Sequence, residues 1–505
     1  MIEWALFVVS TILIWYFNTR LPNNYPPTPP TRLPFLGHAH YLILHRTTDI
    51  YEVFRRYNRD GVLALHIGTW RFTVFGKHDI IRDVFSREET NLRDPHFAAV
   101  VKKVRNNSID SPGIIFGHGK HWQEQRRFML STLKDFGVGK TTIEGSINDE
   151  VAYFCQYLEE MLISKLSSYD ENIRPKEMFH IPIINVLWQI VARERFEYED
   201  QKLVGLRDKL VEMMNVPLFQ PNAATFFPFL EEIFPSASMS IEQHQCYAVI
   251  SEIKAFLNVT IKQHRDTFDP DNIRDFIDTY LLEIQERGVK GTSFHASQGE
   301  EQLVNTLLDL FIAGMDTTSN TLSFAILFMV NNQEVQNRVR QEIFDVIGQT
   351  NQPSLKDKAE MPYTEATILE IQRMANIAPD GVPHATKSSI MVGPYAIPQG
   401  HVLMSNLTTV MRDEEEWVKP HTFDPSRFIK NGQIIKSEAL IPFSAGKRQC
   451  PGENLARAEL FLFFVGLIQK FKFETMNPGD KMEIVIQKGV TWKPLLTEPI
   501  KVTKI

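Results

Sequence analysis

The sequence predicts one large unit that is mainly α-helical. Leucine, phenylalanine and glycine recur at helical spacing over 301–330, which predicts a helix of about 45 Å at the standard rise per residue. A second apolar run with helical character, 453–464, follows a glycine-bounded loop. No glycine- or serine-rich linker divides the 505-residue chain after residue 40. We therefore expect residues 38–505 to form a single domain.

Composition narrows the class of protein. The formal net charge is −7, so no overall basic field points to a nucleic acid partner. The three cysteines, Cys155, Cys246 and Cys450, form no Cys-x-x-Cys pair, which argues against a zinc site or a disulfide framework and fits a reducing compartment. The 35 phenylalanines suit a large apolar core or an apolar pocket.

The N-terminus differs from the rest of the chain. Residues 4–17 form an almost unbroken apolar run of about 21 Å as a helix, which is short of the roughly 30 Å hydrocarbon core. The alternative is a cleaved signal peptide, but no small-residue cleavage site follows. Residues 21–37 are instead rich in proline, which makes a stiff, extended hinge. We expect 1–20 to be an uncleaved membrane anchor.

One cysteine lies in a basic loop between two glycines. The loop runs Phe443-Ser-Ala-Gly446-Lys-Arg448-Gln-Cys450-Pro-Gly452 and leads directly into the predicted helix. Turn N–H groups, a helix N-terminus and nearby cations all stabilise a thiolate. A buried structural cysteine is the alternative, since free cysteines are often buried. The loop contains five residues at fixed spacing, Phe, Gly, Arg, Cys and Gly. Such a pattern, however, recurs by chance only on the order of once in ten thousand chains of this length.

The pattern Phe-x-x-Gly-x-Arg-x-Cys-x-Gly resembles the haem-binding loop of the cytochrome P-450 family, the haem-thiolate monooxygenases. The resemblance implies that Cys450 is the ligand of the haem iron, that Phe443 lies beside the thiolate, and that Arg448 binds a haem propionate. It also implies the cytochrome P-450 fold, mainly α with a smaller β region: a triangular prism of helices around a buried haem, crossed by one long central helix.

The middle of the predicted 301–330 helix is unusual. A glycine and two adjacent threonines weaken the stretch Ala313-Gly-Met-Asp316-Thr317-Thr318, and its polar residues argue against a membrane span. Taken alone, it could be a helix with a tolerated polar patch. It is similar, however, to the oxygen-activation motif of the family. This similarity implies that Thr317 donates a hydrogen bond to dioxygen and that Asp316 relays protons from solvent.

Further residues match the groups that hold haem in the family. Trp122 and Arg126 are four positions apart, so they share one helical face. His384 resembles a histidine that reaches a propionate in the drug-metabolising subfamily, and guanidinium and imidazole are natural partners of carboxylates. The alternatives are an ordinary core tryptophan and an ordinary core or surface histidine.

Three charged residues match a structural triad of the family. Glu370 and Arg373 are three positions apart on one predicted helical face, and Arg427 follows in a Pro-x-Arg-Phe motif. The resemblance implies a buried cluster that locks the fold behind the cysteine loop. An exposed Glu/Arg pair, the alternative, would contribute little to stability.

The resemblance also places substrate-pocket positions at Phe116, Ala313, Val382 and Val490. All four are apolar, as a cavity for a lipophilic substrate requires, although each alone could be plain core. The proline-punctuated stretch 216–230 is unusually apolar, which suggests a substrate entrance at the membrane surface; a covered loop is the alternative.

Basic residues would gather on the cysteine side of such a fold and suit docking of an acidic flavin reductase. The resemblance implies NADPH-cytochrome P-450 reductase as the electron donor, with cytochrome b5 as a further partner. The basic positions concerned are Lys120, His121, Arg126, Arg127, Lys134, Lys140, Lys447 and Arg448.

Together these features predict a haem b enzyme that uses NADPH-derived electrons to insert one oxygen atom into a lipophilic small molecule. We expect a steroid or sterol-derived hormone first, then a terpenoid or fatty acid, then a xenobiotic. The segments HGKHWQEQRRFMLSTLKDFGVGK and PFSAGKRQCPGE look closest to the microsomal branch with vertebrate drug- and steroid-oxidising enzymes. That implies an endoplasmic reticulum membrane protein facing the cytosol. The alternatives are a peroxide-using isomerase or dehydratase and a non-catalytic haem sensor or carrier.

Overall fold

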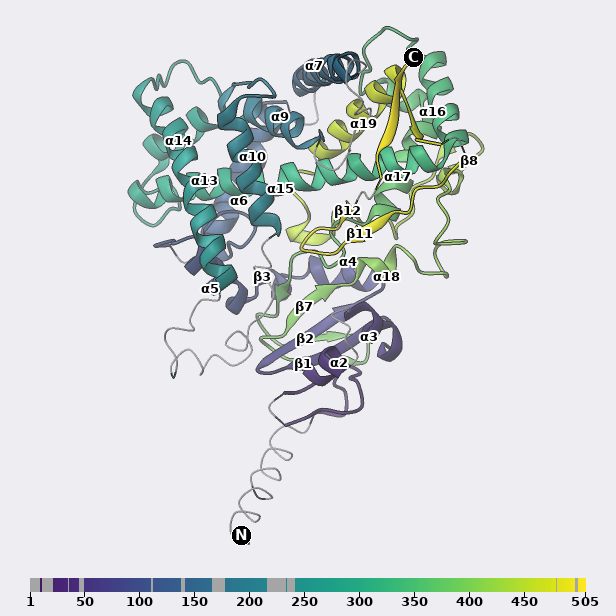
Figure 1. The fold of residues 1–505 in the computed structure, drawn as a ribbon. Coiled ribbons are helices and arrows are strands. Elements are labelled where there is room, and N and C mark those ends of the chain that lie inside the picture. Colours follow the sequence, from purple (N-terminus) through teal and green to yellow (C-terminus); the bar gives the residue numbers. More distant parts are fainter. Residues whose placement is uncertain are drawn as a thin grey trace.

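A computed structural model shows a large helical part and a smaller β region (Figure 1). It describes residues 10, 21–34, 36–44, 50–109, 112–137, 141–165, 178–215, 233, 241–477, 479–495 and 498–505. The expected fold class, mainly α with a smaller β region, is confirmed. Figure 1 shows β1, β2 and β7 at one end of the molecule with α2 and α3, while the long helices lie together at the other.

Helices account for most of the described chain. Their bounds are α2 (Ala39–Leu44), α3 (Ile50–Tyr57), α4 (His78–Ser86), α5 (Pro95–Val104), α6 (Gly119–Asp135), α7 (Thr141–Lys165), α9 (His180–Ala192), α10 (Gln201–Asn215), α13 (Ile241–Asp266), α14 (Phe276–Arg287), α15 (Ala296–Asn331), α16 (Gln333–Val346), α17 (Pro362–Ala375), α18 (Leu407–Val410) and α19 (Glu453–Lys470). Short 3-10 turns are η1 (Glu88–Thr90), η3 (Asp357–Glu360), η4 (Pro425–Phe428) and η5 (Gly446–Arg448).

The helix predicted over 301–330 is α15, which begins five residues earlier and ends one residue later. It is 36 residues long and buried along most of its length, so it forms the axis of the helical part. Helix α9 packs closely on its middle, because a Cβ on Gly314 would lie 2.9 Å from Leu187 Cδ1. The indole of Trp188 and the ring of Phe311 lie 4.8 Å apart at the same contact.

The main sheet joins distant parts of the sequence. Its strand order is β1 (Val62–Ile67), β2 (Trp70–Phe75), β7 (Val402–Ser405), β4 (His384–Ala385) and β3 (Leu92–Arg93). Strands β2 and β7 pair in parallel, and the other neighbours are antiparallel. The β3–β4 register sets Arg93 opposite His384. The sheet thus brings an arginine and a histidine together beside the helical part.

Within the described residues, four two-stranded sheets complete the β structure. They are β5 (Ile390–Val392) with β6 (Tyr395–Ile397), β8 (Ile429–Lys430) with β9 (Gln433–Ile434), β10 (Phe471–Thr475) with β13 (Ile500–Lys504), and β11 (Val485–Gln487) with β12 (Lys493–Leu495). The β11–β12 hairpin is fastened to the segment after α17, because the N–H of Trp492 donates to the Ile377 carbonyl at 2.7 Å. In Figure 1 this hairpin lies close to α15.

The described part of the proline-rich hinge lies against the β region. The hydroxyl of Tyr25 is 2.6 Å from Nε2 of His66 and 3.3 Å from Nε2 of His401. The Ala64 N–H donates to the Pro27 carbonyl at 2.7 Å. These contacts attach the start of the described chain to strand β1 and to the residue before β7.

Two of the sequence predictions fall outside the described residues. They are the anchor at 1–20, apart from residue 10, and the apolar stretch 216–230. Within the described chain, no helix combines the length and the apolar character needed to cross a bilayer.

Candidate functional site

The cysteine loop is closed by backbone contacts. The Cys450 N–H donates to the Phe443 carbonyl at 3.1 Å, and η5 forms the turn between them. Gly446 has φ +78°, and a Cβ there would lie 2.0 Å from the Phe85 carbonyl oxygen at the end of α4. Only glycine fits this position. Gly452 has φ −90°, a conformation that does not require glycine.

Cys450 differs from the other two cysteines. Cys155 and Cys246 are buried, whereas Cys450 is exposed. Its thiol is accessible on one side but otherwise enclosed by protein, and this desolvation raises its pKa above the ordinary value. A hydrogen bond from the Gly452 N–H and the charge of Arg126 act in the opposite direction but do not outweigh it. A metal ion would supply the missing positive charge, since coordination deprotonates a thiol.

Two guanidiniums gather around the indole of Trp122, which comes from α6. The Cζ of Arg448 lies 3.4 Å from the indole ring centroid, and that of Arg126 lies 5.8 Å from it. Arg448 donates to the Asn91 carbonyl oxygen from Nε at 3.1 Å and from Nη2 at 3.0 Å. The indole N–H donates to the Ile114 carbonyl at 3.1 Å, so Trp122 offers the site its ring face.

Arg93, which no motif marked, joins this cluster from β3. Its Nε donates to the Ile115 carbonyl at 2.8 Å and its Nη1 to the Val382 carbonyl at 2.8 Å. Burial lowers the pKa of Arg93 to about 9, and repulsion from Arg126 adds to the effect. Burial followed by repulsion from the other two arginines lowers the pKa of Arg448 to about 8.

The three guanidiniums, Arg93, Arg126 and Arg448, call for an anion. Within the described chain none of them has a carboxylate partner. The buried Nη1 of Arg448 has no hydrogen-bond partner. Buried charges are normally paired, so this cluster fits a ligand that brings carboxylates of its own. The two propionates of haem meet that requirement beside a cysteine that can bind its iron.

His384 lies at the edge of the same cluster. Its ring stacks on Phe85 with centroids 4.0 Å apart, and its Nδ1 lies 2.9 Å from the Thr90 carbonyl, so it donates there. Burial lowers the pKa of His384 well below its ordinary value, and the nearby Arg93 and Arg448 lower it further. The ring is therefore neutral in this arrangement. A carboxylate placed beside it would favour the charged form.

One face of α15 is open in the middle of the protein. Ala313 is exposed and Thr317 is half-buried, whereas Phe311, Met315 and Asp316 are buried. The Thr317 hydroxyl donates to the Ala313 carbonyl one turn earlier at 2.7 Å. Back-bonding of this kind is the distortion that a mid-helix threonine introduces. The predicted catalytic threonine thus lies on the accessible face.

Asp316 lies on the buried side of the same turn. Its Oδ1 is 3.0 Å from the Lys493 ammonium, and its Oδ2 accepts from the Asn320 amide at 3.0 Å and from the Thr491 hydroxyl. The side chain is fully buried. We expected Asp316 to exchange protons with solvent, but in this arrangement it has no direct contact with solvent.

Glu370, Arg373 and Arg427 come together as one buried cluster. The Glu370 carboxylate accepts from Nε and Nη2 of Arg373, both at 2.8 Å, and from Nε of Arg427 at 3.1 Å. Arg373 also donates to the carbonyls of Met411 and Pro420. The cluster links α17 to the loop before η4, which leads on to the cysteine loop.

The four predicted pocket positions share partial or full exposure. Val382 is 38% and Val490 49% exposed, Ala313 is exposed, and Phe116 is half-buried with the Arg105 guanidinium 5.7 Å from its ring centroid. The Val382 carbonyl accepts a hydrogen bond from Arg93, so Val382 lies beside the arginine cluster. Apolar side chains that stay accessible in this way are suited to line a binding cavity.

Only some of the residues predicted to form a basic face lie on the surface. Arg448 is buried in the cluster, which removes it from any docking face, and Lys140 is outside the described residues. Lys447 pairs with Glu88, and Lys120 lies 3.6 Å from Glu124. The exposed members of the predicted set are Lys120, Arg127, Lys134 and Lys447, while His121 and Arg126 are half-buried.

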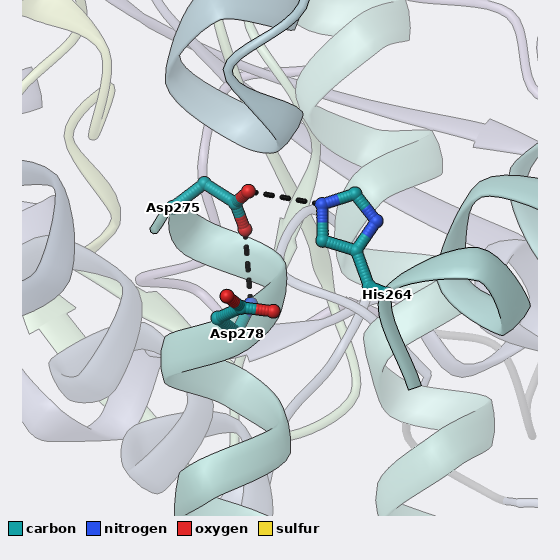
Figure 2. Close-up of side chains that lie close together, drawn as sticks. All are labelled: His264, Asp275 and Asp278. Atoms are coloured by element: carbon teal, nitrogen blue, oxygen red, sulfur yellow. Dashed lines mark hydrogen bonds and ion pairs between the residues drawn. The ribbon is translucent and has the colours of Figure 1, made fainter. Parts of the chain in front are cut away.

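A histidine and two aspartates also meet between α13 and α14, as Figure 2 shows. His264 Nε2 lies 2.9 Å from Asp275 Oδ2, and its Nδ1 lies 2.9 Å from the Thr260 carbonyl. Asp275 also caps α14 by accepting the Asp278 N–H at 3.0 Å. Asp278 is held by the Arg274 guanidinium at 2.5 and 2.8 Å. These partners satisfy the three side chains, so the cluster clamps two helices.

Comparison with known proteins places this geometry in a family. The family model described as "Cytochrome P450" matches residues 26–500. The chain is 34% identical over 492 residues to cytochrome P450 2J1 of Oryctolagus cuniculus, covering 97% of this chain and 93% of the relative. It is 34% identical over 485 residues to human cytochrome P450 2J2, with 95% and 91% covered.

Cytochrome P450 2D10 of Mus musculus is similarly related, at 36% identity over 487 residues, with 94% of this chain and 92% of the relative covered. The predicted likeness to vertebrate microsomal enzymes is therefore confirmed. Haem is the cofactor of the family, and its microsomal members receive electrons from NADPH through a reductase. The chain belongs to the cytochrome P450 family and is a haem-dependent monooxygenase.

Proposed function

We propose that this monooxygenase oxidises a lipophilic small molecule by hydroxylation or epoxidation. The observation that supports this is the open face of α15, where the accessible Ala313 lies one turn before Thr317. Val382 and Val490 add apolar, accessible side chains from the segment after α17 and from the β11–β12 hairpin. Steroids or sterol-derived hormones are our first choice of substrate, then terpenoids or fatty acids, then xenobiotics.

The proposed roles follow from the contacts. Cys450 binds the haem iron, and Arg93, Arg126, Arg448 and His384 hold the propionates. Trp122 supports two of the guanidiniums through its ring face. Phe443 holds the Cys450 backbone through its carbonyl and would lie beside the thiolate, with its ring centroid 4.9 Å from the Arg457 guanidinium. When bound, haem supplies the redox chemistry that activates dioxygen.

Thr317 and Asp316 form the proposed proton-delivery pair. The Thr317 hydroxyl donates to the Ala313 carbonyl, which is a side-chain contact and not a bond of the helix ladder, so it can turn toward the open face without breaking the helix. Glu370, Arg373 and Arg427 have the proposed structural role and take no part in the chemistry.

Two substitutions test these roles. Cys450→Ala should abolish the thiolate-type spectrum of the reduced carbon monoxide complex, and a variant that keeps it would exclude Cys450 as the iron ligand. Thr317→Ala should keep haem bound but divert electrons from product to hydrogen peroxide. Thr321→Ala is the matched control, since Thr321 makes the same back-bond to the Thr317 carbonyl, at 2.8 Å. Unchanged coupling in Thr317→Ala would remove Thr317 from proton delivery.

Substrate class can be tested directly by screening. Steroids, terpenoids, fatty acids and drug-like compounds would be titrated into the holoprotein, and displacement of water from the iron followed by the shift in the haem spectrum. Oxygen uptake coupled to NADPH and to the selected ligand would exclude a non-catalytic sensor or carrier. Product formed from peroxides without NADPH would support an isomerase or dehydratase instead.

We also propose that the chain is anchored in the endoplasmic reticulum membrane through residues 1–20, followed by the hinge 21–37 and a catalytic domain 38–505 that faces the cytosol. NADPH-cytochrome P-450 reductase, with cytochrome b5, is the proposed electron donor. Resistance of the full chain to alkaline extraction from microsomes would support the anchor. Digestion of the catalytic domain by protease added outside intact microsomes would support its cytosolic orientation. Salt-sensitive reduction that weakens in Arg127→Glu and Lys134→Glu would support docking on the basic face.

A further inference from the structure

A single lysine connects the predicted proton-delivery aspartate to another helix. Lys493, the first residue of β12, is almost fully buried, and its ammonium lies 3.0 Å from Asp316 Oδ1. The same ammonium lies 3.3 Å from Oδ1 of Asn215, the last residue of α10. Two positions before it, the Thr491 hydroxyl donates to the other Asp316 oxygen. One hairpin thus supplies two partners to one carboxylate.

The ion pair holds the Asp316 carboxylate in place. The carboxylate is fully buried, and an unpaired buried charge is costly, so the Lys493 ammonium supplies the partner that this position needs. A lysine ammonium is also a compact charge on a flexible stem. It can therefore move between Asp316 and Asn215 while it keeps one hydrogen-bond partner.

We propose that Lys493 is a positioning residue that holds the Asp316 carboxylate in place between proton deliveries. This rests on the proposed roles of Asp316 and Thr317. In each delivery, protonated Asp316 gives its proton to the Thr317 hydroxyl as that hydroxyl releases its own to the oxygen substrate. The alcohol is unchanged, and the carboxylate anion is left to pair again with Lys493. Asp316 has no direct contact with solvent while it is paired, so the next proton reaches it when the Lys493 ammonium has moved to Asn215.

The tie to Asn215 extends this pair to the end of α10. Movement of α10 away from β12 would leave Asp316 as the partner of the Lys493 ammonium. Movement of α10 toward β12 would strengthen the competing contact between Lys493 and Asn215. Lys493 therefore has two separable functions: holding the Asp316 carboxylate, and joining α10 to the β11–β12 hairpin. Variants can remove one function without the other.

Lys493→Met removes both functions, Lys493→Arg keeps the charge, and Asn215→Ala removes only the tie to α10. Lys501→Met, at an exposed lysine of β13, is the control for loss of a strand lysine. We expect Lys493→Met to lower product formation about tenfold or more, since positioned acid–base groups contribute about 10² to 10⁴. The electrons should appear as hydrogen peroxide, and the solvent deuterium isotope effect on turnover should increase.

Lys493→Arg should restore most of the coupling, and Asn215→Ala should leave coupling and isotope effect as in the unmodified enzyme. Hydrogen exchange supplies a readout that does not depend on turnover. Both Lys493→Met and Asn215→Ala should speed amide exchange in the last turn of α10. Lys493→Gln, which keeps a hydrogen-bond donor without the charge, replaces the methionine variant if that variant fails to bind haem.

The proposal is overturned if an uncharged, haem-loaded Lys493 variant shows unchanged coupling and isotope effect. It is also overturned if Asn215→Ala uncouples the enzyme as strongly as Lys493→Met, since the lysine would then act only as a structural tie. Asp316→Asn and Thr317→Ala distinguish this failure from failure of the proposed function. If they uncouple the enzyme and Lys493→Met does not, only the role of Lys493 is wrong.

Discussion

Removal of the Glu370 carboxylate should destabilise the protein strongly while leaving the site residues in place. Glu370 and Arg373 are both fully buried, and their side chains share two hydrogen bonds of 2.8 Å. In Glu370→Ala, the Arg373 guanidinium would keep the Met411 and Pro420 carbonyls but lose its only counter-charge within the described chain. Arg427 would lose the same partner.

The size of the effect follows from the burial of the pair. Breaking a buried ion pair by removing one partner costs about 3–5 kcal/mol, because the remaining charge stays desolvated. The Asp424 N–H, which donates to Glu370 at 3.0 Å, would also lose its acceptor. Arg427 is 9% exposed, so water can compensate it only in part. We therefore expect the free energy of unfolding to fall by an amount near the upper end of the range of about 3–5 kcal/mol.

Urea denaturation, followed by the thiolate-type carbon monoxide spectrum and by far-ultraviolet circular dichroism, measures this loss. Glu415→Gln is the control, since Glu415 lies 3.4 Å from Lys77 in a pair whose side chains are 43% and 78% exposed. That variant should lose less than about 1 kcal/mol. If Glu370→Ala is as stable as Glu415→Gln, the triad does not hold the fold together and the reasoning from burial is wrong.

Three further predictions concern single residues. Burial disfavours the charged form of His264, but its hydrogen bonds to Asp275 and Thr260 outweigh burial and raise its pKa. The stabilisation that charged His264 gives the fold should therefore be complete below a pH of about 6.5 and be lost as the pH rises through the elevated pKa. His264→Gln should flatten this pH dependence of the denaturation midpoint, and an unchanged profile would contradict it. Gly446→Ala should weaken haem retention much more than Gly432→Ala, because both have positive φ but only the first Cβ meets a backbone, at 2.0 Å. Arg448→Leu should raise the haem dissociation rate by about tenfold or more, since hydrogen bonds to charged groups contribute about 1.5–3 kcal/mol; an unchanged rate measured by transfer to apomyoglobin would refute its role as a propionate partner.

The elements set by local patterns were predictable. The spacing of apolar residues located α15 to within five residues at its start, since a buried helix shows its period in the sequence. The spacing of Glu370 and Arg373 on one helical face is likewise local. The contact with Arg427, 57 positions from Glu370, was available only through the family resemblance.

Contacts made by the fold itself were not predictable. Arg93 lies in a two-residue strand with no motif around it, and only the β3–β4 pairing brings it to the cluster. Lys493 and Thr491 are 177 and 175 positions from Asp316, and nothing in their local sequence marks a partner. The burial of Asp316 could not be predicted for the same reason, because the hairpin that supplies its partners lies far away in the chain.

The parallel pairing of β2 with β7 has a consequence for synthesis of the chain. Phe72 pairs with Val402, so one edge of β2 stays without its partner strand until that later segment has been made. At typical rates of about 5–20 residues per second, this interval is roughly 15–70 s. During that time a strand that reads Trp-Arg-Phe-Thr-Val-Phe presents unpaired backbone groups, a known risk for aggregation. Nascent chains released before Val402 should therefore depend on chaperones much more than chains released after Ser405.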